Sequence, residues 1–272
     1  MSKFSVLMAV YAKEKADIFD VSLRSNITEQ TLKPDEFVLV CDGELTAELE
    51  AVISYYAMLY PDIFIVYRKE KEGLGLALRY GLERCSYPLV ARSDSDDVCV
   101  PTRFEKQVKY MDSHPEVGVV SSYIDEFRSE WTAPIRTKTL PLTHEELCEK
   151  AKFRNPLNHM AVMMRKDDII RIGSYIHLPY IEDYELWVRA IANGIQLGNI
   201  GEVLVHARVG DGMVKRRGKK RTVYSYHRVY NYMVKQGMIS RSVYLLNMFA
   251  VILFIFIPSS LRAYIYTRYL RD

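Results

Sequence analysis

The first hundred residues alternate apolar runs with amphipathic stretches, and this rhythm restricts the folds that the chain can adopt. Four runs have the continuous apolar character of strands covered on both faces. They span 4–10, 36–42, 63–68 and 87–94. Three helical stretches separate them, at 17–29, 45–59 and 74–85. Strand and helix therefore repeat at intervals of about 20 to 30 residues, which predicts a parallel α/β sheet.

Distinctive residues stand at the ends of three of these strands. Tyr11 follows the first strand, Asp42 ends the second and Asp94 ends the fourth. Parallel strands present their carboxyl ends at one edge of the sheet, and ligands of open α/β sheets bind in the crevice there. We therefore expect these three residues to face a single crevice.

The stretch LVARSDSDDVCVP, residues 89–101, crowds three carboxylates beside one arginine. Asp94, Asp96 and Asp97 lie within four positions of the chain, and Arg92 stands just before them. Like charges this close repel each other, so a counter-ion is expected. Carboxylates at this spacing suit Mg²⁺ or Mn²⁺, with positions left open for phosphate and water. The alternative is that Asp97 caps the helix that begins a few residues later.

The second half of the chain is less regular. Its predicted elements are helices at 103–115 and 182–194, strands at 117–122 and 159–165, and a helix capped by Thr143 and Glu146. The glycines of EGLGLALRYG, residues 72–81, predict either a tight turn that lets the backbone approach a ligand or a plain helix start. This stretch lacks the position and pattern of a dinucleotide fingerprint, which should follow the first strand, and it has no phosphate-loop lysine.

Charge is spread unevenly along the chain. The net charge of +3 is too small to imply a nucleic-acid partner. Between Arg208 and Arg241, however, there are ten Lys or Arg residues and one acid, and the run KRRGKKR at 215–221 has six basic residues in seven. Such a run predicts either a solvated face or a segment that binds phosphates or anionic lipid.

The four cysteines have no metal-like spacing, and the N-terminal stretch does not read as a secretory signal. Both observations predict buried, reduced thiols in a cytosolic protein.

The stretch VYLLNMFAVILFIFI, 243–257, has fifteen residues and no charge. It is shorter than the roughly 20 apolar residues that span a bilayer. Tyrosines and arginines follow Pro258, a composition typical of a membrane interface. We therefore predict monotopic attachment to a membrane surface. The alternatives are a helix buried in the core or in a dimer contact, and a true span.

Five separated motifs carry a family resemblance: SVLMAVY, VLVCDGE, GLGLALRYGL, ARSDSDD followed by P.RFEKQ, and EDYELWVRA. Over about residues 3–210 the chain resembles the glycosyltransferase family 2 enzymes of bacterial O-antigen, capsule and exopolysaccharide assembly. The resemblance implies a GT-A fold, a Rossmann-like α/β sheet with a nucleotide-sugar half (1–100) and an acceptor half (101–210). A basic lid or helix (211–240) and C-terminal membrane-associating helices (241–272) complete the predicted organisation.

The resemblance also implies which residues contact the nucleotide-sugar. Val10 and Tyr11 resemble the wall beside the base, and Glu14 lies in the same loop. Asp42 resembles an aspartate that accepts a hydrogen bond from the uracil ring. The other contacts implied for uridine, ribose, diphosphate or sugar are Gly73, Leu74, Arg92, Asp94 and Ser95.

Metal binding and catalysis are implied for the acidic motifs. Asp96 is expected to hold Mn²⁺ or Mg²⁺ against the diphosphate, and Asp183 to take the proton of the acceptor hydroxyl. Glu182 and His159 are expected on the acceptor side, with a helix-dipole role open for Glu182 and a structural role open for His159. The basic residues expected to close over the diphosphate as a lid are Arg208, Lys215, Arg216 and Arg217.

The implied function is inverting, metal-dependent transfer of a hexose, Gal or Glc, from a UDP-sugar. The implied acceptor is a GlcNAc-type sugar on undecaprenyl diphosphate, at the cytoplasmic face of the bacterial inner membrane, with a homodimer as an option. One alternative is a sugar-nucleotide nucleotidyltransferase, but YAKEKAD after the first strand lacks the glycine-rich loop of that class. The other is a non-catalytic sugar-nucleotide-binding scaffold at the membrane, which the presence of both Asp96 and Asp183 disfavours.

Overall fold

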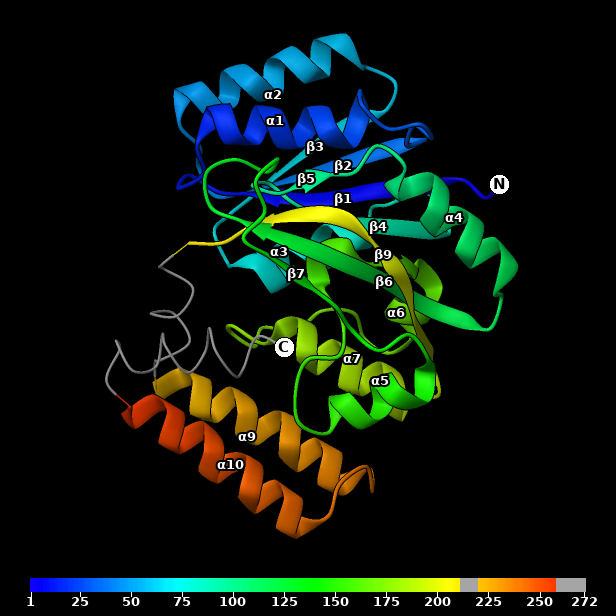
Figure 1. Ribbon diagram of the computed structural model, residues 1–272. Helices are drawn as coiled ribbons and strands as arrows, with labels where there is room; N and C mark the ends of the chain where they lie inside the picture. The colour runs from blue at the N-terminus through cyan, green and yellow to red at the C-terminus, as the bar shows by residue number, and fades with distance from the viewer. Residues whose placement is uncertain (211–219, 258–272) are drawn as a thin grey trace.

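The computed structural model describes residues 1–210 and 220–257 and centres on one mixed sheet (Figure 1). The strands run in the order β3-β2-β1-β4-β8-β6-β9-β5, with β7 paired to β6. Their bounds are β1 Phe4–Val10, β2 Glu36–Asp42, β3 Phe64–Lys69, β4 Leu89–Asp94, β5 Val98–Cys99, β6 Val117–Phe127, β7 Arg136–Lys138, β8 Met163–Arg165 and β9 Gln196–Arg208. The first four neighbours, β3 to β4, are all parallel, which confirms the parallel α/β half predicted from the sequence.

Helices cover both faces of the sheet (Figure 1). One face packs against α1 (Ala16–Ile27), α2 (Ala47–Leu59) and α4 (Arg103–Ser113). The other face packs against α3 (Leu74–Leu82), α5 (His144–Ala151), α6 (Lys166–Arg171) and α7 (Glu182–Ala192). A hairpin of α9 (Lys220–Lys235) and α10 (Arg241–Phe256) packs on α7 and forms a further layer.

Alternation along β1 shows why the sheet is buried on both sides. Phe4, Val6 and Met8 lie in the core beneath α1, α2 and α4, whereas Leu7 points to the opposite core beneath α3. Each fully buried side chain of this size contributes about 1.5–3 kcal/mol to stability. The α3 helix approaches so closely that a Cβ at Gly81 would lie 2.3 Å from Leu7 Cδ1.

The sheet curls so that its far edge returns to its middle. β4 is the fourth strand in the sheet order and β5 is the last, yet only residues 95–97 connect them. β5 pairs antiparallel with β9, with Val98 opposite His206. The short connection therefore holds the outer edge of the sheet against the carboxyl end of β4.

Several sequence predictions need correction. The predicted strand 159–165 is a strand only over Met163–Arg165, because His159–Ala161 forms a 3-10 turn, with Ala161 N–H donating to Asn158 O. The helix predicted at 103–115 ends at Ser113. No sequence pattern predicted α6 or the long strand β9. The capping box of Thr143 and Glu146 at α5 is confirmed.

The cysteines are free thiols, as predicted, with three of the four fully buried.

The α9–α10 hairpin turns a broad apolar face outward. Val229, Tyr230 and Met233 of α9 are buried against α7. On α10, Leu245 is 66% exposed and Phe249 is 64% exposed. This exposure contradicts the alternative that 243–257 is a helix buried in the protein core. None of the helices in 1–210 and 220–257 combines the length and hydropathy that crossing a bilayer requires.

Candidate active site

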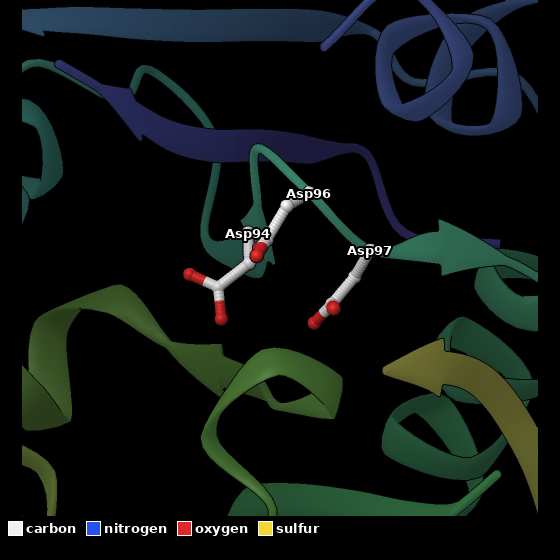
Figure 2. A group of neighbouring side chains, drawn as sticks. All are labelled: Asp94, Asp96 and Asp97. Atoms are coloured by element: carbon white, nitrogen blue, oxygen red, sulfur yellow. The ribbon is translucent and has the colours of Figure 1, made fainter. Parts of the chain in front are cut away.

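The acidic stretch forms a compact cluster where β4 ends. The side chains of Asp94, Asp96 and Asp97 point into the same space (Figure 2), and one carboxylate oxygen from each lies within 4.8 Å of the others. Asp97 is 4% exposed, and its Oδ1 accepts a 2.7 Å hydrogen bond from the Arg208 backbone N–H. Its Oδ2 is buried and has no hydrogen-bond partner among the described residues. The capping alternative for Asp97 is therefore wrong, because the carboxylate binds β9 and not the start of α4.

Two buried arginines partly offset this negative charge. Arg92 and Asp94 lie two residues apart on β4, so their side chains share a face of the sheet. The Arg92 guanidinium, 2% exposed, donates to both carboxylate oxygens of Asp94. Beneath the loop, the fully buried Arg103 donates to the Arg92 carbonyl at 2.6 Å and to Ser93 Oγ at 3.0 Å. Part of the expected counter-charge thus comes from the chain itself.

The remaining repulsion leaves the cluster suited to a cation. Burial, then Asp94 and Glu14, raise the pKa of Asp96 to about 7. Burial and the two neighbouring aspartates raise the pKa of Asp97 well above its ordinary value. A divalent cation would relieve both penalties and would satisfy the orphaned Asp97 Oδ2. The residues present therefore fit the metal that the acidic motif implies.

The residues predicted to contact the base and ribose gather beside this cluster. Asp42 accepts hydrogen bonds from the backbone N–H groups of Glu72 at 2.9 Å and Gly73 at 3.0 Å. Gly73 has φ +99°, a conformation that favours glycine, and stands at the N-terminus of α3. Asp42 thus shapes the α3 entry as well as facing the crevice.

Other members of this group line the same rim. Glu14 Oε2 accepts a 2.9 Å hydrogen bond from Ser95 Oγ, which joins the loop after β1 to the acidic loop. Lys71 Nζ lies 5.8 Å from the centre of the Tyr11 ring. The Val10 side chain does not reach this rim, because it is 1% exposed and packs in the core, whereas Leu74 is 38% exposed at the start of α3. An open depression of about 840 Å³ adjoins them, lined by Gly43, Glu44, Leu45, Glu50, Arg68, Lys69, Glu70 and Lys71.

The start of α7 brings two further carboxylates to the crevice. Asp183 Oδ2 accepts a hydrogen bond from Asn155 Nδ2, and its Oδ1 accepts one from its neighbour's backbone N–H, that of Tyr184, at 2.8 Å. Burial, followed by Asp183, raises the pKa of Glu182 to about 7. Arg92 and Asp94 also influence that pKa, so the α7 and β4 groups lie within electrostatic reach of each other.

Close packing fixes this arrangement from the α3 side. A Cβ at Gly75 would lie 2.9 Å from the Ile176 carbonyl oxygen and 3.4 Å from Glu182 Cβ. Gly75 therefore allows the N-termini of α3 and α7 to approach each other. This explains the glycine-rich stretch in physical terms: one glycine supplies the turn and the other the close contact.

The remaining predicted residues separate into three groups. His159 is buried, its Nε2 lies 2.9 Å from Tyr175 Oη, and burial lowers its pKa well below the ordinary value, which favours the structural role. Arg208 Nε donates to the Asp96 carbonyl at 3.3 Å, so its side chain does reach the acidic loop. The lid residues Lys215, Arg216 and Arg217 lie outside the described residues.

Sequence reasoning missed two residues and one backbone contact that support the site. Asn155 orients Asp183, Arg103 holds the base of the acidic loop, and the Arg208 backbone binds Asp97. Arg103 stands within P.RFEKQ, one of the family motifs, whereas Asn155 lies four residues before the predicted strand 159–165. The Arg208 contact joins residues 111 positions apart, and no local pattern signals it.

Comparison with known proteins gives the family. The protein-family sequence model described as Glycosyl transferase family 2 matches residues 5–170 of this chain. The chain therefore belongs to glycosyltransferase family 2 and is a glycosyltransferase, which decides against both the nucleotidyltransferase and the non-catalytic alternative.

Individual relatives cover most of the chain. It is 46% identical over 216 residues to the amylovoran biosynthesis glycosyltransferase AmsE of Erwinia amylovora, covering 79% of this chain and 80% of the relative. It is 35% identical over 269 residues to the UDP-Gal:alpha-D-GlcNAc-diphosphoundecaprenol beta-1,3-galactosyltransferase of Escherichia coli, covering 99% and 97%.

A solved structure supports the fold. The mannosyltransferase PcManGT from Pyrobaculum calidifontis, in complex with GDP-Man and Mn²⁺, matches with a TM-score of 0.65 at 16% identity, over 99% of this chain and 82% of that one. This likeness confirms the GT-A-like α/β fold.

Proposed function

We propose that this chain is an inverting, metal-dependent hexosyltransferase of bacterial surface-polysaccharide assembly. It would move Gal or Glc from a UDP-sugar to a GlcNAc-type sugar on undecaprenyl diphosphate. The observation that carries the proposal is the meeting of two acidic groups at one crevice: the Asp94–Asp97 loop after β4, and Glu182 with Asp183 at the start of α7. The first group suits a metal with a diphosphate, and the second suits an attacking hydroxyl.

Asp96, with Asp94 and Asp97 beside it, would hold Mn²⁺ or Mg²⁺. When bound, such an ion offsets the negative charge that grows on the departing diphosphate. Arg208 stands next to the loop and adds positive charge at the same place. The basic residues 215–217, which follow it in the sequence, are the proposed remainder of the lid.

Asp183 is the proposed catalytic base. Inversion needs one carboxylate to accept the hydroxyl proton while the hydroxyl oxygen attacks the anomeric carbon. Asn155 and the Tyr184 N–H fix the orientation of the Asp183 carboxylate. Glu182, with its pKa raised to about 7, is partly protonated at neutral pH and would donate a hydrogen bond on the acceptor side. Asp42, Tyr11 and their neighbours would contact the nucleoside.

The relatives support the choice of substrates. The name of the Escherichia coli relative specifies a UDP-Gal donor and a GlcNAc-diphosphoundecaprenol acceptor, and that relative matches nearly the full length of this chain. The name of the Erwinia relative places it in amylovoran biosynthesis, which is also polysaccharide assembly. Galactose is therefore the first donor to test, and glucose the second.

A lipid-linked acceptor would require the protein to work at the membrane, and the α10 face supplies a surface for this. Its outward residues form an apolar strip that no described residue covers: Leu245, Leu246, Phe249, Ile252 and Leu253. Apolar strips of this kind bind membranes by burying their side chains among the lipid headgroups and chains. We propose that α10 lies on the cytoplasmic face of the inner membrane.

Charge favours an anionic bilayer over a second copy of the chain as the cover for this strip. Residues 212–271 contain twelve Lys or Arg and no Asp or Glu, whereas residues 1–211 contain 25 basic and 33 acidic residues. Arg221, Arg228 and Arg241 of the hairpin are exposed. Two such cationic segments would repel each other in a dimer, whereas anionic lipid attracts each Lys or Arg by about 1 kcal/mol.

The test is UDP release by purified full-length chain. UDP-Gal, UDP-Glc and the two N-acetylhexosamine donors are offered with a GlcNAc-diphosphate-lipid analogue, with Mn²⁺ and then with chelator. Release with one donor, dependent on both acceptor and metal, is the expected result. Release that persists in chelator would contradict metal dependence, and the absence of release with every donor would contradict the proposed substrates.

A further inference from the structure

Trp131 stands on the rim of the crevice without a role in the proposed reaction. It lies in the connection between β6 and β7, and its side chain is 41% exposed. The other tryptophan of the chain, Trp187, is completely buried. An indole exposed to this extent contributes little to the core and offers a flat apolar surface to a ligand.

The structure holds this indole in place. Its ring centre lies 5.3 Å from that of His206 on β9, and His206 Nδ1 lies 3.6 Å from Asp125 Oδ2 on β6. Burial lowers the pKa of His206, and the neighbouring Asp125 partly opposes this shift. The connection itself is fixed by backbone bonds, from Ala133 to Glu130 and from Ile135 to Glu126. The indole of Trp131 is therefore held in place by its contact with His206 and by the backbone bonds of its connection.

Arg208 ties this rim to the acidic loop. It lies two residues beyond His206 on β9, so the two side chains share a face of the strand. Its Nη1 donates to the carbonyls of Arg128 at 3.0 Å and Ser129 at 3.4 Å, and its Nε donates to the Asp96 carbonyl at 3.3 Å. One guanidinium thus spans the distance between the acidic loop and the residues just before Trp131. In Figure 1 this connection lies where β6 and β9 both end.

The position of Trp131 in the sheet decides which ligand it faces. The residues assigned to the base and uridine end or follow β1, β2 and β3, on one side of β4. Trp131 follows β6 and rests on β9, on the other side of β4. The acidic loop thus lies between the indole and the residues assigned to the base, and the indole lies on the side where the proposed function would place the acceptor.

We infer that Trp131 is a stacking platform for a pyranose ring of the acceptor. The C–H groups on one face of a pyranose form an apolar surface that packs on an indole, while its hydroxyls remain free for hydrogen bonds. This inference rests on the proposed function, since it names an acceptor subsite of the same crevice. A donor sugar would be the other source of a pyranose, and the experiment separates the two.

The kinetic test compares Trp131→Ala and Trp131→Phe with the unaltered chain, using UDP-Gal and the GlcNAc-diphosphate-lipid analogue. Trp131→Ala is expected to raise the acceptor KM about three- to tenfold, with donor KM and acceptor-free UDP-Gal hydrolysis unchanged. Trp131→Phe should recover most of the affinity. Ile135→Ala, which removes another exposed apolar side chain from the same connection, should leave the acceptor KM unchanged. An acceptor KM raised less than threefold by Trp131→Ala, or a raised donor KM, would overturn the inference.

A binding test keeps the inference separate from the proposed transfer reaction. Acceptor analogue added to the unaltered chain should change the intrinsic fluorescence, because Trp131 is the exposed indole. In Trp131→Phe, which retains only the buried Trp187, the signal should not respond. A response of the unaltered chain without turnover on any donor would refute the proposed reaction and support the platform. Equal responses in the chain and the variant would refute the platform.

Discussion

The crevice and the outer face of α10 differ in which side chains they bury and which they expose. In the crevice, charged side chains are buried and fixed: Arg92 pairs with Asp94, and the Arg208 N–H holds Asp97. On α10, large apolar side chains such as Leu245 and Phe249 are exposed, although the helix itself is packed on α9. Burying charge and exposing hydrocarbon both cost stability, so each region keeps a costly feature that folding does not require.

This contrast indicates two separable tasks. The crevice carries repulsion between carboxylates that a metal cation would relieve, and α10 carries apolar surface that a membrane would cover. If the tasks are separate, changes in one region leave the measurable property of the other unchanged. Four predictions, taken from the largest expected effect to the smallest, test this separation.

Asp96→Asn should reduce transfer at least about a thousandfold, because the metal contributes several kcal/mol of charge stabilisation. UDP release at saturating Mn²⁺ measures this. The same variant should unfold at an equal or higher temperature than the unaltered chain in metal-free buffer, since one of three crowded carboxylates loses its charge. Its binding to anionic vesicles should be unchanged. Activity within tenfold of the unaltered chain would remove Asp96 from the metal site.

Asp183→Asn should lower kcat by about 10²–10³-fold, as expected for loss of a general base. Calorimetry should show UDP binding in Mn²⁺ within about twofold of the unaltered chain, because Asp183 belongs to α7 and not to the nucleotide rim. The matched control is Asp167→Asn, an aspartate in the first turn of α6, which should keep full activity. Equal losses in both variants would show that Asp183 has no special role.

The double variant Leu245→Asp with Phe249→Asp should abolish sedimentation with vesicles of phosphatidylglycerol and cardiolipin. Each large apolar side chain that enters the membrane contributes about 1.5–3 kcal/mol. Turnover on a short-chain, water-soluble acceptor analogue should stay within about twofold. Gln236→Asp with Ser242→Asp adds the same charge at exposed hairpin positions outside the apolar strip and should retain binding. A variant that still sediments would place the membrane contact elsewhere.

Glu182→Gln should reduce, by about 1–3 kcal/mol, the loss of unfolding free energy that the protein shows between pH 5 and pH 8. Because the pKa of Glu182 is raised to about 7, the folded state binds more protons than the unfolded state between its ordinary pKa and pH 7. The free energy of unfolding contributed by this group therefore falls as pH rises through that window. Urea unfolding at pH 5 and pH 8 should show a smaller loss in the variant. An identical pH slope in both proteins would contradict the raised pKa.

Sequence reasoning succeeded where local pattern and structure share one cause. The bounds of β1 and β2 match their predicted ranges, 4–10 and 36–42, because every position in these strands except Ser5, Glu36 and Asp42 is apolar. The position of the acidic loop could also be predicted, because the carboxyl ends of parallel strands lie at one edge of the sheet. Asp42, Asp94 and Tyr11 could therefore be grouped without a structure.

It failed where distant segments decide the outcome. β9 contains Gly198 and Gly201, which weaken any strand pattern. The structure explains the first, because a Cβ at Gly198 would lie 2.5 Å from Tyr110 Oη on α4. The pairing of β9 with β6 is also interrupted by register shifts. The contacts of Asp97 with Arg208 and of Asp183 with Asn155 depend on this long-range pairing and packing, which no sequence window contains.

The connection of three residues between β4 and β5 has a consequence for the time at which the site is assembled. β5 pairs with β9, a strand that leaves the ribosome about a hundred residues later. Until β9 has been made, Asp97 lacks the hydrogen bond from the Arg208 N–H, and the acidic loop relies on its contacts with Glu14, Arg92 and Arg103. Contacts this distant in sequence form late in folding. A growing chain therefore completes the parallel strands β1 to β4 first, and the acidic loop gains its contact with Arg208 only after β9 has been made.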